Sequence, residues 1–249
     1  MKKIITLFAL MLCLCATAQQ AADTMYIYRN DKVIERIPVA RIDSVVFVAP
    51  VAPIVPPADT LDEAVDLGLS VKWASCNVGA TKPEEYGGYY AWGEIEEKAN
   101  CAWNTYKWCN GSNTMTKYCT NSSSGTIDNK IVLDPEDDVA HVKWGGNWRM
   151  PTSAEQYELL ENCTWQWTSV NGVNGYKVTG PNGNSIFLPA AGCRYGSDVI
   201  DRGSDGIYWS SSLGSGDGSD AYLLYFNDGH YDWSYNYRYY GQSVRPVSM

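Results

Sequence analysis

The sequence predicts an α+β fold made of short antiparallel strands, few helices and many loops. Its 249 residues are 45% hydrophobic, which is enough to bury a sizeable core. Short apolar stretches alternate with Gly- and Asn-containing turns, and one segment carries a complete helix start. These features favour short strands and irregular loops over a helical bundle or a parallel sheet.

The amino terminus has the pattern of a secretory signal peptide. Lys2 and Lys3 precede an apolar run over residues 4–15, and small residues follow at 16–18. We therefore expect residues 1–18 to be removed and the protein to be secreted or displayed at the cell surface, with the periplasm as the less favoured location. No later stretch is apolar over the length that a membrane helix needs, so no transmembrane segment is expected after cleavage.

Residues 19–48 are predicted to form a small β module. Strands are expected at 25–28 and 33–37 around a polar turn, with a third apolar piece at 42–48. Residues 49–60 contain four prolines, which cannot continue a helix or a central strand, and therefore predict an extended linker. Residues 61–249 contain no second linker and are expected to form one domain.

Within residues 61–249, the clearest helix start lies at Thr152. Thr152 and Glu155 have the spacing of a capping box, and the helix is expected to end near Asn162. Residues 176–179 and 185–188 flank a Gly-Pro-Asn-Gly-Asn turn and predict a hairpin. Near the carboxyl terminus, residues 242–247 are expected to return as a final strand.

Charge and composition exclude several classes of function. The chain has 28 acidic and 19 basic residues, a net charge of −9, and no basic cluster, which argues against a nucleic-acid partner. Only His141, expected in a strand, and His230, expected in a turn, are available for a histidine-based metal site or catalytic triad. We interpret the acidic residues 134–138 as a solvated loop, and we expect no enzymatic activity, no metal and no cofactor.

Six of the eight cysteines follow the signal peptide. Disulfides are expected among them because the exported compartment is oxidising, although six cysteines allow fifteen pairings. Cys101, Cys109 and Cys119 are spaced by eight and ten residues, which fits no zinc-ligand pattern.

Residues 214–241 consist mainly of Tyr, Ser, Asp, Gly, Asn and His, and they contain no Lys or Glu. Antibody loops use a similar mixture, because Tyr provides contact area at low entropic cost and the small polar residues provide adaptable hydrogen bonds. Alternation through residues 222–227 predicts a strand, and Asp228-Gly229 predicts a turn after it. We interpret Trp233 and Arg238 as scaffold residues, and we expect the residues that flank them to be displayed at the surface. The alternative is that these tyrosines form the half-buried face of an ordinary sheet.

Five sequence blocks occur in order along the domain: DLGLSVKWA at 66–74, GGYYAWGE at 87–94, WRMPT at 148–152, YWSSS at 208–212 and SVRPV at 243–247. Together they resemble the Fibrobacter succinogenes major paralogous domain, and the resemblance covers about residues 61–249. It implies a C-type-lectin-like fold whose two ends meet, in a secreted or cell-surface protein of a Bacteroidetes-type bacterium.

The end of the domain resembles the variable region of a diversity-generating retroelement. In such regions asparagine codons are rewritten to Tyr, Ser, Asp, His or Gly, the residue types that dominate here. The resemblance implies fixed scaffold positions at Leu224, Phe226, Trp233, Arg238 and Gly241. It implies variable ligand-binding positions at Leu223, Tyr225, Asn227, Asp228, His230, Asp232, Ser234, Tyr235, Asn236, Tyr237, Tyr239 and Tyr240.

The expected partner is an unidentified protein or cell-surface ligand. Two alternatives remain open: a non-varying fimbrial or adhesive surface component, and a carbohydrate-binding module. Sugar-binding C-type lectins hold calcium through Glu-Pro-Asn or Gln-Pro-Asp and Trp-Asn-Asp triplets, and the sequence contains none of these. Formylglycine-generating enzymes use a cysteine pair near the carboxyl terminus, and the last cysteine here is Cys193.

Overall fold

The computed structural model describes residues 24–29, 32–38, 64–111, 114–216 and 218–249. The chain divides into two compact units, Met1–Val51 and Ala52–Met249. This division falls within the stretch for which the sequence predicts a linker, residues 49–60, but that stretch itself lies outside the described residues. In the described part of the chain, no helix combines the length and apolar character that crossing a membrane requires.

The first unit contains an antiparallel hairpin of β1 (Thr24–Arg29) and β2 (Lys32–Pro38). The two strands predicted at 25–28 and 33–37 are confirmed, and the pairing is irregular between Ile27 and Tyr28. The predicted signal peptide at 1–18 and the third apolar piece at 42–48 lie outside the described residues.

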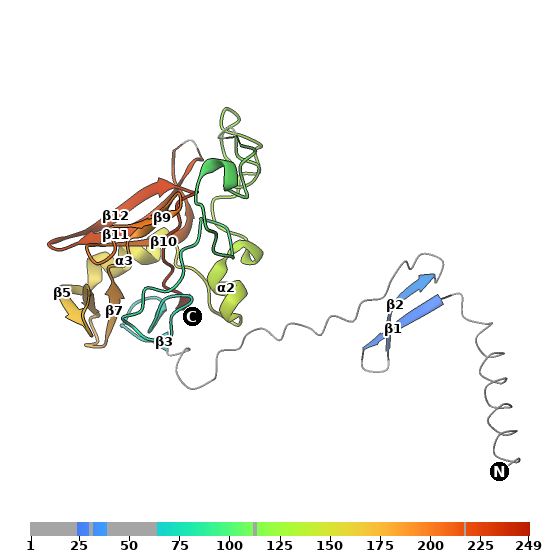
Figure 1. The fold of residues 1–249 in the computed structure, drawn as a ribbon. Helices are drawn as coiled ribbons and strands as arrows, with labels where there is room; N and C mark the ends of the chain where they lie inside the picture. The colour runs from blue at the N-terminus through green and yellow to red at the C-terminus, as the bar shows by residue number, and fades with distance from the viewer. Residues whose placement is uncertain (1–23, 30–31, 39–63, 112–113, 217) are drawn as a thin grey trace, which may run out of the picture. The chain divides into compact units, whose positions relative to one another are not determined.

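The second unit is built mostly from antiparallel strands, with two α-helices among its described residues (Figure 1). This confirms a β-rich α+β fold. The helices are α2 (Val139–Trp144) and α3 (Ser153–Asn162), and short 3-10 helices lie at Trp103–Thr105 and Pro135–Asp137. The strands are β3 (Ala64–Val65), β4 (Lys72–Ala74), β5 (Thr164–Val170), β6 (Val173–Thr179), β7 (Ser185–Pro189), β8 (Cys193–Tyr195), β9 (Asp198–Ile200), β10 (Asp205–Leu213), β11 (Asp220–Asn227), β12 (His230–Tyr237) and β13 (Val247–Ser248).

Two local predictions are confirmed in this unit. The backbone N–H of Glu155 donates to Thr152 Oγ1 over 3.3 Å, and Thr152 N–H donates back to the Glu155 carboxylate over 2.7 Å. The capping box therefore starts α3 at Ser153, and the helix ends at Asn162 as expected. The predicted hairpin is β6 paired with β7.

The structure corrects the interpretation of the acidic segment and of His141. Residues 134–138 are not a solvated loop, because Asp137 is 2% exposed and Asp138 is 5% exposed. Asp138 accepts hydrogen bonds from the backbone N–H groups of Ala140 and His141 and so starts a second helix, α2, which the sequence analysis missed. His141 lies on α2 rather than on a strand.

The central sheet, β10-β11-β12, separates two large hydrophobic clusters. Trp209 and Leu223 belong to one cluster, whereas Tyr208, Leu224 and Phe226 belong to the other. Because side chains of a strand alternate between faces, β10 and the adjoining β11 are buried on both sides. β12 is one of the two edge strands of this sheet, and its residues are exposed or half-buried.

The end of the domain returns to its beginning. β13 pairs with β4, and β4 pairs with β3, so the carboxyl terminus lies beside β4 in the same small sheet as β3 (Figure 1). Val244 and Val247 are both fully buried, but the final strand is shorter than predicted and starts only at Val247. Residues 242 and 243 instead form isolated bridges with Tyr90 and Tyr208.

The six cysteines of the second unit are present as thiols in this structure, and disulfide pairing among them stays a prediction. The thiol of Cys119 donates to the carbonyl oxygen of Asn121 over 3.1 Å. Burial raises the pKa of Cys163 to about 11 and that of Cys193 to about 12, so both groups are protonated at neutral pH.

Candidate functional site

The β11–β12 hairpin carries most of the positions that the sequence singled out. Its register pairs Leu223 with Ser234 and Tyr225 with Asp232, and directly paired residues lie on the same side of a sheet. We call this side the front face. The predicted residues that share it are Leu223, Tyr225, Asn227, His230, Asp232, Ser234 and Asn236.

Exposure differs along the front face. His230 and Asp232 are exposed, and Asn227, Ser234 and Asn236 are half-buried. Tyr225 is also half-buried, and its hydroxyl accepts a hydrogen bond of 2.9 Å from the amide of Asn227. Leu223, however, is only 3% exposed, which corrects the expectation that it is displayed. It lies on the inner strand, where the first hydrophobic cluster covers it.

The other side of the hairpin, the helix-side face, packs toward α3 and the β5-β6-β7 sheet. On β11 it presents Leu224 and Phe226 to the second cluster, and both are buried as expected for scaffold. On β12 it presents four aromatic residues. Their exposed fractions are 41% for Tyr231, 49% for Trp233, 62% for Tyr235 and 48% for Tyr237.

Two predictions concern this face. The predicted site residues Tyr235 and Tyr237 are exposed, but they lie opposite the front face. Trp233 was interpreted as scaffold, and its 49% exposure corrects this. As a residue of an edge strand it has no second strand beside it, and its ring contacts Tyr222 at a centroid distance of 5.7 Å.

Beyond β12, Tyr239 and Tyr240 join an aromatic cluster. Tyr239 is only 8% exposed, which corrects the expectation that it is displayed, because its ring lies 4.8 Å from Trp103. Tyr240 stacks on Tyr195 with ring centroids 5.0 Å apart. Sequence reasoning missed Trp103 and Tyr195, since both come from distant segments that carry no local signal of this surface.

Arg238 is confirmed as scaffold, with its side chain fully buried. Its guanidinium donates to the hydroxyl of Tyr106 and to the carbonyl oxygens of Lys117, Tyr118 and Gly218 over 2.8 to 3.1 Å. Gly241 is buried too, and a Cβ there would lie 3.0 Å from Cys101 Sγ. The segment after β12 is therefore fixed at both of these positions.

The turn and the free edge of the hairpin are built from polar residues. Asp228 is exposed in the turn, and Gly229 adopts a φ of 91°, which favours glycine. On β12, the side chains of Asp232 and Asn236 accept hydrogen bonds of 2.8 Å from the N–H groups of Trp233 and Tyr237. These side chains occupy edge N–H groups that would otherwise be open to another strand.

The hairpin is acidic and aromatic. Residues 220–237 include Asp220, Asp228 and Asp232 but no Lys or Arg. His230 lies near Tyr225, with ring centroids 6.2 Å apart. Hydroxyl, amide and carboxylate groups next to exposed rings suit recognition by contact and hydrogen bonding.

Within the described residues, one group of carboxylates is close enough to hold a cation: Asp134, Glu136 and Asp137. The ammonium of Lys117 already lies 2.6 Å from both Asp134 and Asp137. Burial lowers the pKa of Lys117, but the hydrogen bonds that its ammonium donates to these carboxylates outweigh burial and raise that pKa above its usual value. Lys107 also pairs with Asp137 and Lys130 with Asp134, so three lysines of the protein itself compensate the charge of the cluster.

Comparison with protein families, with curated proteins and with solved structures finds no match for this chain.

Proposed function

We propose that this chain is a secreted or cell-surface ligand-binding protein whose C-type-lectin-like domain displays a diversified surface on the β11–β12 hairpin. One observation carries the proposal: seven of the twelve predicted variable positions share the front face, while Leu224 and Phe226 between them are buried in the core. The polar positions of β12 can therefore change without disturbing the packing that Leu224 and Phe226 provide.

The aromatic content of the hairpin supports binding of a protein or cell-surface target. Tyr231, Tyr235 and Tyr237 are each more than 40% exposed. Exposed aromatic clusters of this kind are typical of interaction sites, because tyrosine buries a large area at low entropic cost and keeps a hydroxyl for hydrogen bonding. The resemblance to the Fibrobacter succinogenes major paralogous domain and to retroelement variable regions supports diversification of these positions in the gene.

The revised set of diversified positions omits two of the predicted residues. Leu223 and Tyr239 are 3% and 8% exposed, so substitution there changes the core rather than the surface. The remaining positions are Tyr225, Asn227, Asp228, His230, Asp232, Ser234, Tyr235, Asn236, Tyr237 and Tyr240.

Sequencing of the gene and its neighbouring DNA across a bacterial population tests diversification directly. We expect a reverse transcriptase gene nearby, a near-copy of the hairpin codons, and substitutions concentrated at adenine positions of that copy. Codons for Leu224, Phe226 and Arg238 should stay constant. Uniform conservation of the whole segment would instead support a non-varying adhesive component.

A pair of libraries tests the structural side of the proposal. In the first, Asp232, Ser234 and Asn236 are randomised; in the matched library, Leu224, Phe226 and Arg238 are randomised. We expect most members of the first library to resist proteolysis and most members of the second to be degraded, because buried large-to-small changes cost about 2–5 kcal/mol each. Similar losses in both libraries would contradict the separation of surface from scaffold.

A carbohydrate-binding function is the second candidate, and one observation favours it. Tyr195, which is 50% exposed, stacks with Tyr240 and offers a flat aromatic surface of the kind on which sugar rings pack. A glycan array with the full mature chain separates the candidates. Glycan binding that Tyr195→Ala abolishes supports the carbohydrate module, whereas no glycan signal alongside binding to a protein target excludes it.

A further inference from the structure

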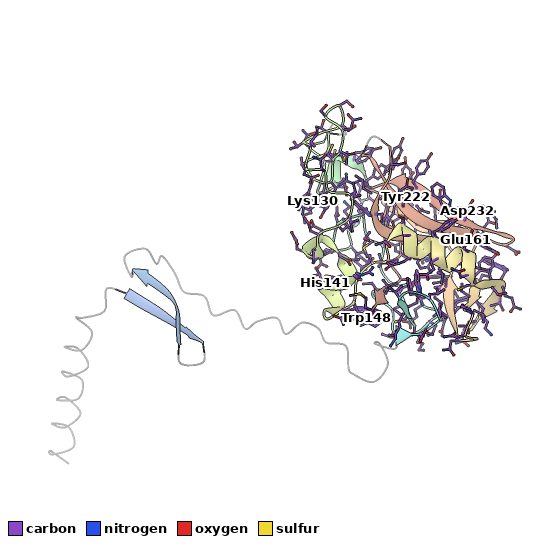
Figure 2. All side chains as sticks on the ribbon, turned by 180° about the vertical axis from the view of Figure 1, so that it is seen from behind. Lys130, His141, Trp148, Glu161, Tyr222 and Asp232 are labelled. Atoms are coloured by element: carbon purple, nitrogen blue, oxygen red, sulfur yellow. The ribbon has the colours of Figure 1, made fainter. Side chains whose placement is uncertain are left out.

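A recess lies between α3 and the helix-side face of the hairpin, opposite the front face. Its volume is about 280 Å³, and it is lined by Ser153, Gln156, Tyr157, Tyr222 and Trp233, together with Ala154 and the buried Leu223. Figure 2 shows the domain from the side on which α3 crosses the hairpin, with Tyr222 labelled above the helix. The recess is therefore separate from the positions proposed to vary on the front face.

Three aromatic rings line this recess. Tyr222 and Trp233 contact each other with their ring planes at 64°, so they form two walls set at an angle. Tyr157 contributes the third ring from α3. It is 51% exposed and is not among the buried residues of the helix. Gln156 is 2% exposed beside them, and its amide donates to the Tyr208 carbonyl oxygen over 3.0 Å. The three rings thus come from α3, β11 and β12, and Gln156 connects α3 to the central sheet.

The surroundings of the recess are acidic. Neither α3 nor residues 220–237 contain a Lys or Arg. Glu161 is exposed and lies four residues after Tyr157, so both are on one side of the helix. Asp232 is exposed on the same strand but points to the front face, so Glu161 is the carboxylate on the recess side (Figure 2).

We propose that this recess binds a trimethylammonium group. Aromatic faces attract cations through the ring quadrupole, and the attraction is greatest for weakly hydrated organic cations enclosed by several rings. The Glu161 carboxylate adds favourable charge and disfavours anionic ligands, and neither α3 nor the hairpin carries a Lys or Arg to oppose it. A neutral apolar group of the same shape would gain only the apolar contact. The proposal does not depend on diversification of the front face.

Titration of the full mature chain with choline, followed by calorimetry or ligand-observed NMR, tests this site. The matched neutral probe is 3,3-dimethylbutanol, which replaces the charged nitrogen by carbon. We expect choline to bind at least about 10-fold more tightly than the alcohol, because only the cation gains the cation–π attraction. Equal binding of the two probes, or no binding of choline, would overturn the proposal.

Variants locate the binding to the recess. Trp233→Ala and Tyr157→Ala should each weaken choline binding by at least about 10-fold, and Trp233→Phe should retain part of it. Tyr235→Ala is the matched control, since Tyr235 lies on the same strand but does not line the recess. A loss in Tyr235→Ala equal to that in Trp233→Ala would show that choline binds elsewhere. Phosphocholine and trimethyllysine, compared in the same way, distinguish a lipid headgroup from a modified protein as the natural source.

Discussion

Two buried arginines connect the last part of the chain to distant segments. Arg238 binds carbonyl oxygens near residue 118, and Arg245 donates to the Asn77 side chain and to the carbonyl oxygens of Ala74, Ser75 and Phe187. Both side chains are no more than 1% exposed. Carbonyl oxygens accept most of these bonds, so each guanidinium acts as a bridge between loops whose backbone acceptors would otherwise be buried without donors.

We therefore expect Arg238→Met to destabilise the domain by about 3 kcal/mol or more, because it leaves several buried carbonyl oxygens without donors. Arg238→Lys should recover only part of the loss, since an ammonium cannot reproduce the planar arrangement of donors. Urea unfolding of the purified chain measures both effects. Lys177→Ala, an exposed change, is the control. Equal midpoints for Arg238→Met and this control would show that the bonds contribute little.

At the scale of elements, an ion-pair cluster connects two loops near α2. Asp137 is 2% exposed and lies 2.6 Å from Lys117 and 2.7 Å from the Tyr118 hydroxyl. Burial raises the pKa of Asp137, but hydrogen bonds from Lys117 and Tyr118 outweigh it and hold this pKa below the usual value. The folded state thus binds this proton more weakly than the unfolded chain does.

The lowered pKa of Asp137 fixes the sign of the pH dependence. Its contribution to stability is present above the usual aspartate pKa and is lost as the pH falls through the lower value in the folded state. Asp137→Asn should reduce stability on the order of 2 kcal/mol at neutral pH and should flatten the loss below about pH 4. Urea unfolding at a series of pH values measures this, with Glu136→Gln as an exposed control. An unchanged acid profile in Asp137→Asn would contradict the assignment.

At the scale of the whole domain, the two ends of residues 64–249 are connected by backbone pairing. Val247 exchanges hydrogen bonds of 3.1 and 2.8 Å with Arg149, and the carbonyl oxygen of Pro246 accepts one from Ala74. Val247 is fully buried in the cluster that also contains Trp73 and Leu224. The last residues are therefore part of the core rather than a trailing end.

Deletion of residues 246–249 should abolish cooperative unfolding of the domain, even though it removes only the terminus. Val247→Ala should be milder and cost about 2 kcal/mol, because it removes buried methyl groups without removing the backbone pairing. A chain that begins at residue 62 is the control, and it should keep the unfolding transition, since the hydrophobic clusters draw on residues 65–247. Circular dichroism during thermal unfolding measures all three. A cooperative transition in the shortened chain would contradict this view of β13.

The sequence by itself determined the features that depend on neighbouring residues. Local spacing predicts four such features, and the structure has each of them: the capping box at Thr152, the β6–β7 hairpin, the Asp228-Gly229 turn and the alternation of Leu224 with its neighbours.

Only the tertiary structure decided which of the two alternating sides of each strand meets solvent. Leu223 is buried because the first hydrophobic cluster covers it, whereas Trp233 lies on the edge strand, where no cluster encloses it and 49% of it is exposed. The aromatic recess likewise brings together α3 and the hairpin, which are more than 50 residues apart. Periodicity specifies that a strand has two faces, but long-range packing decides what covers each of them.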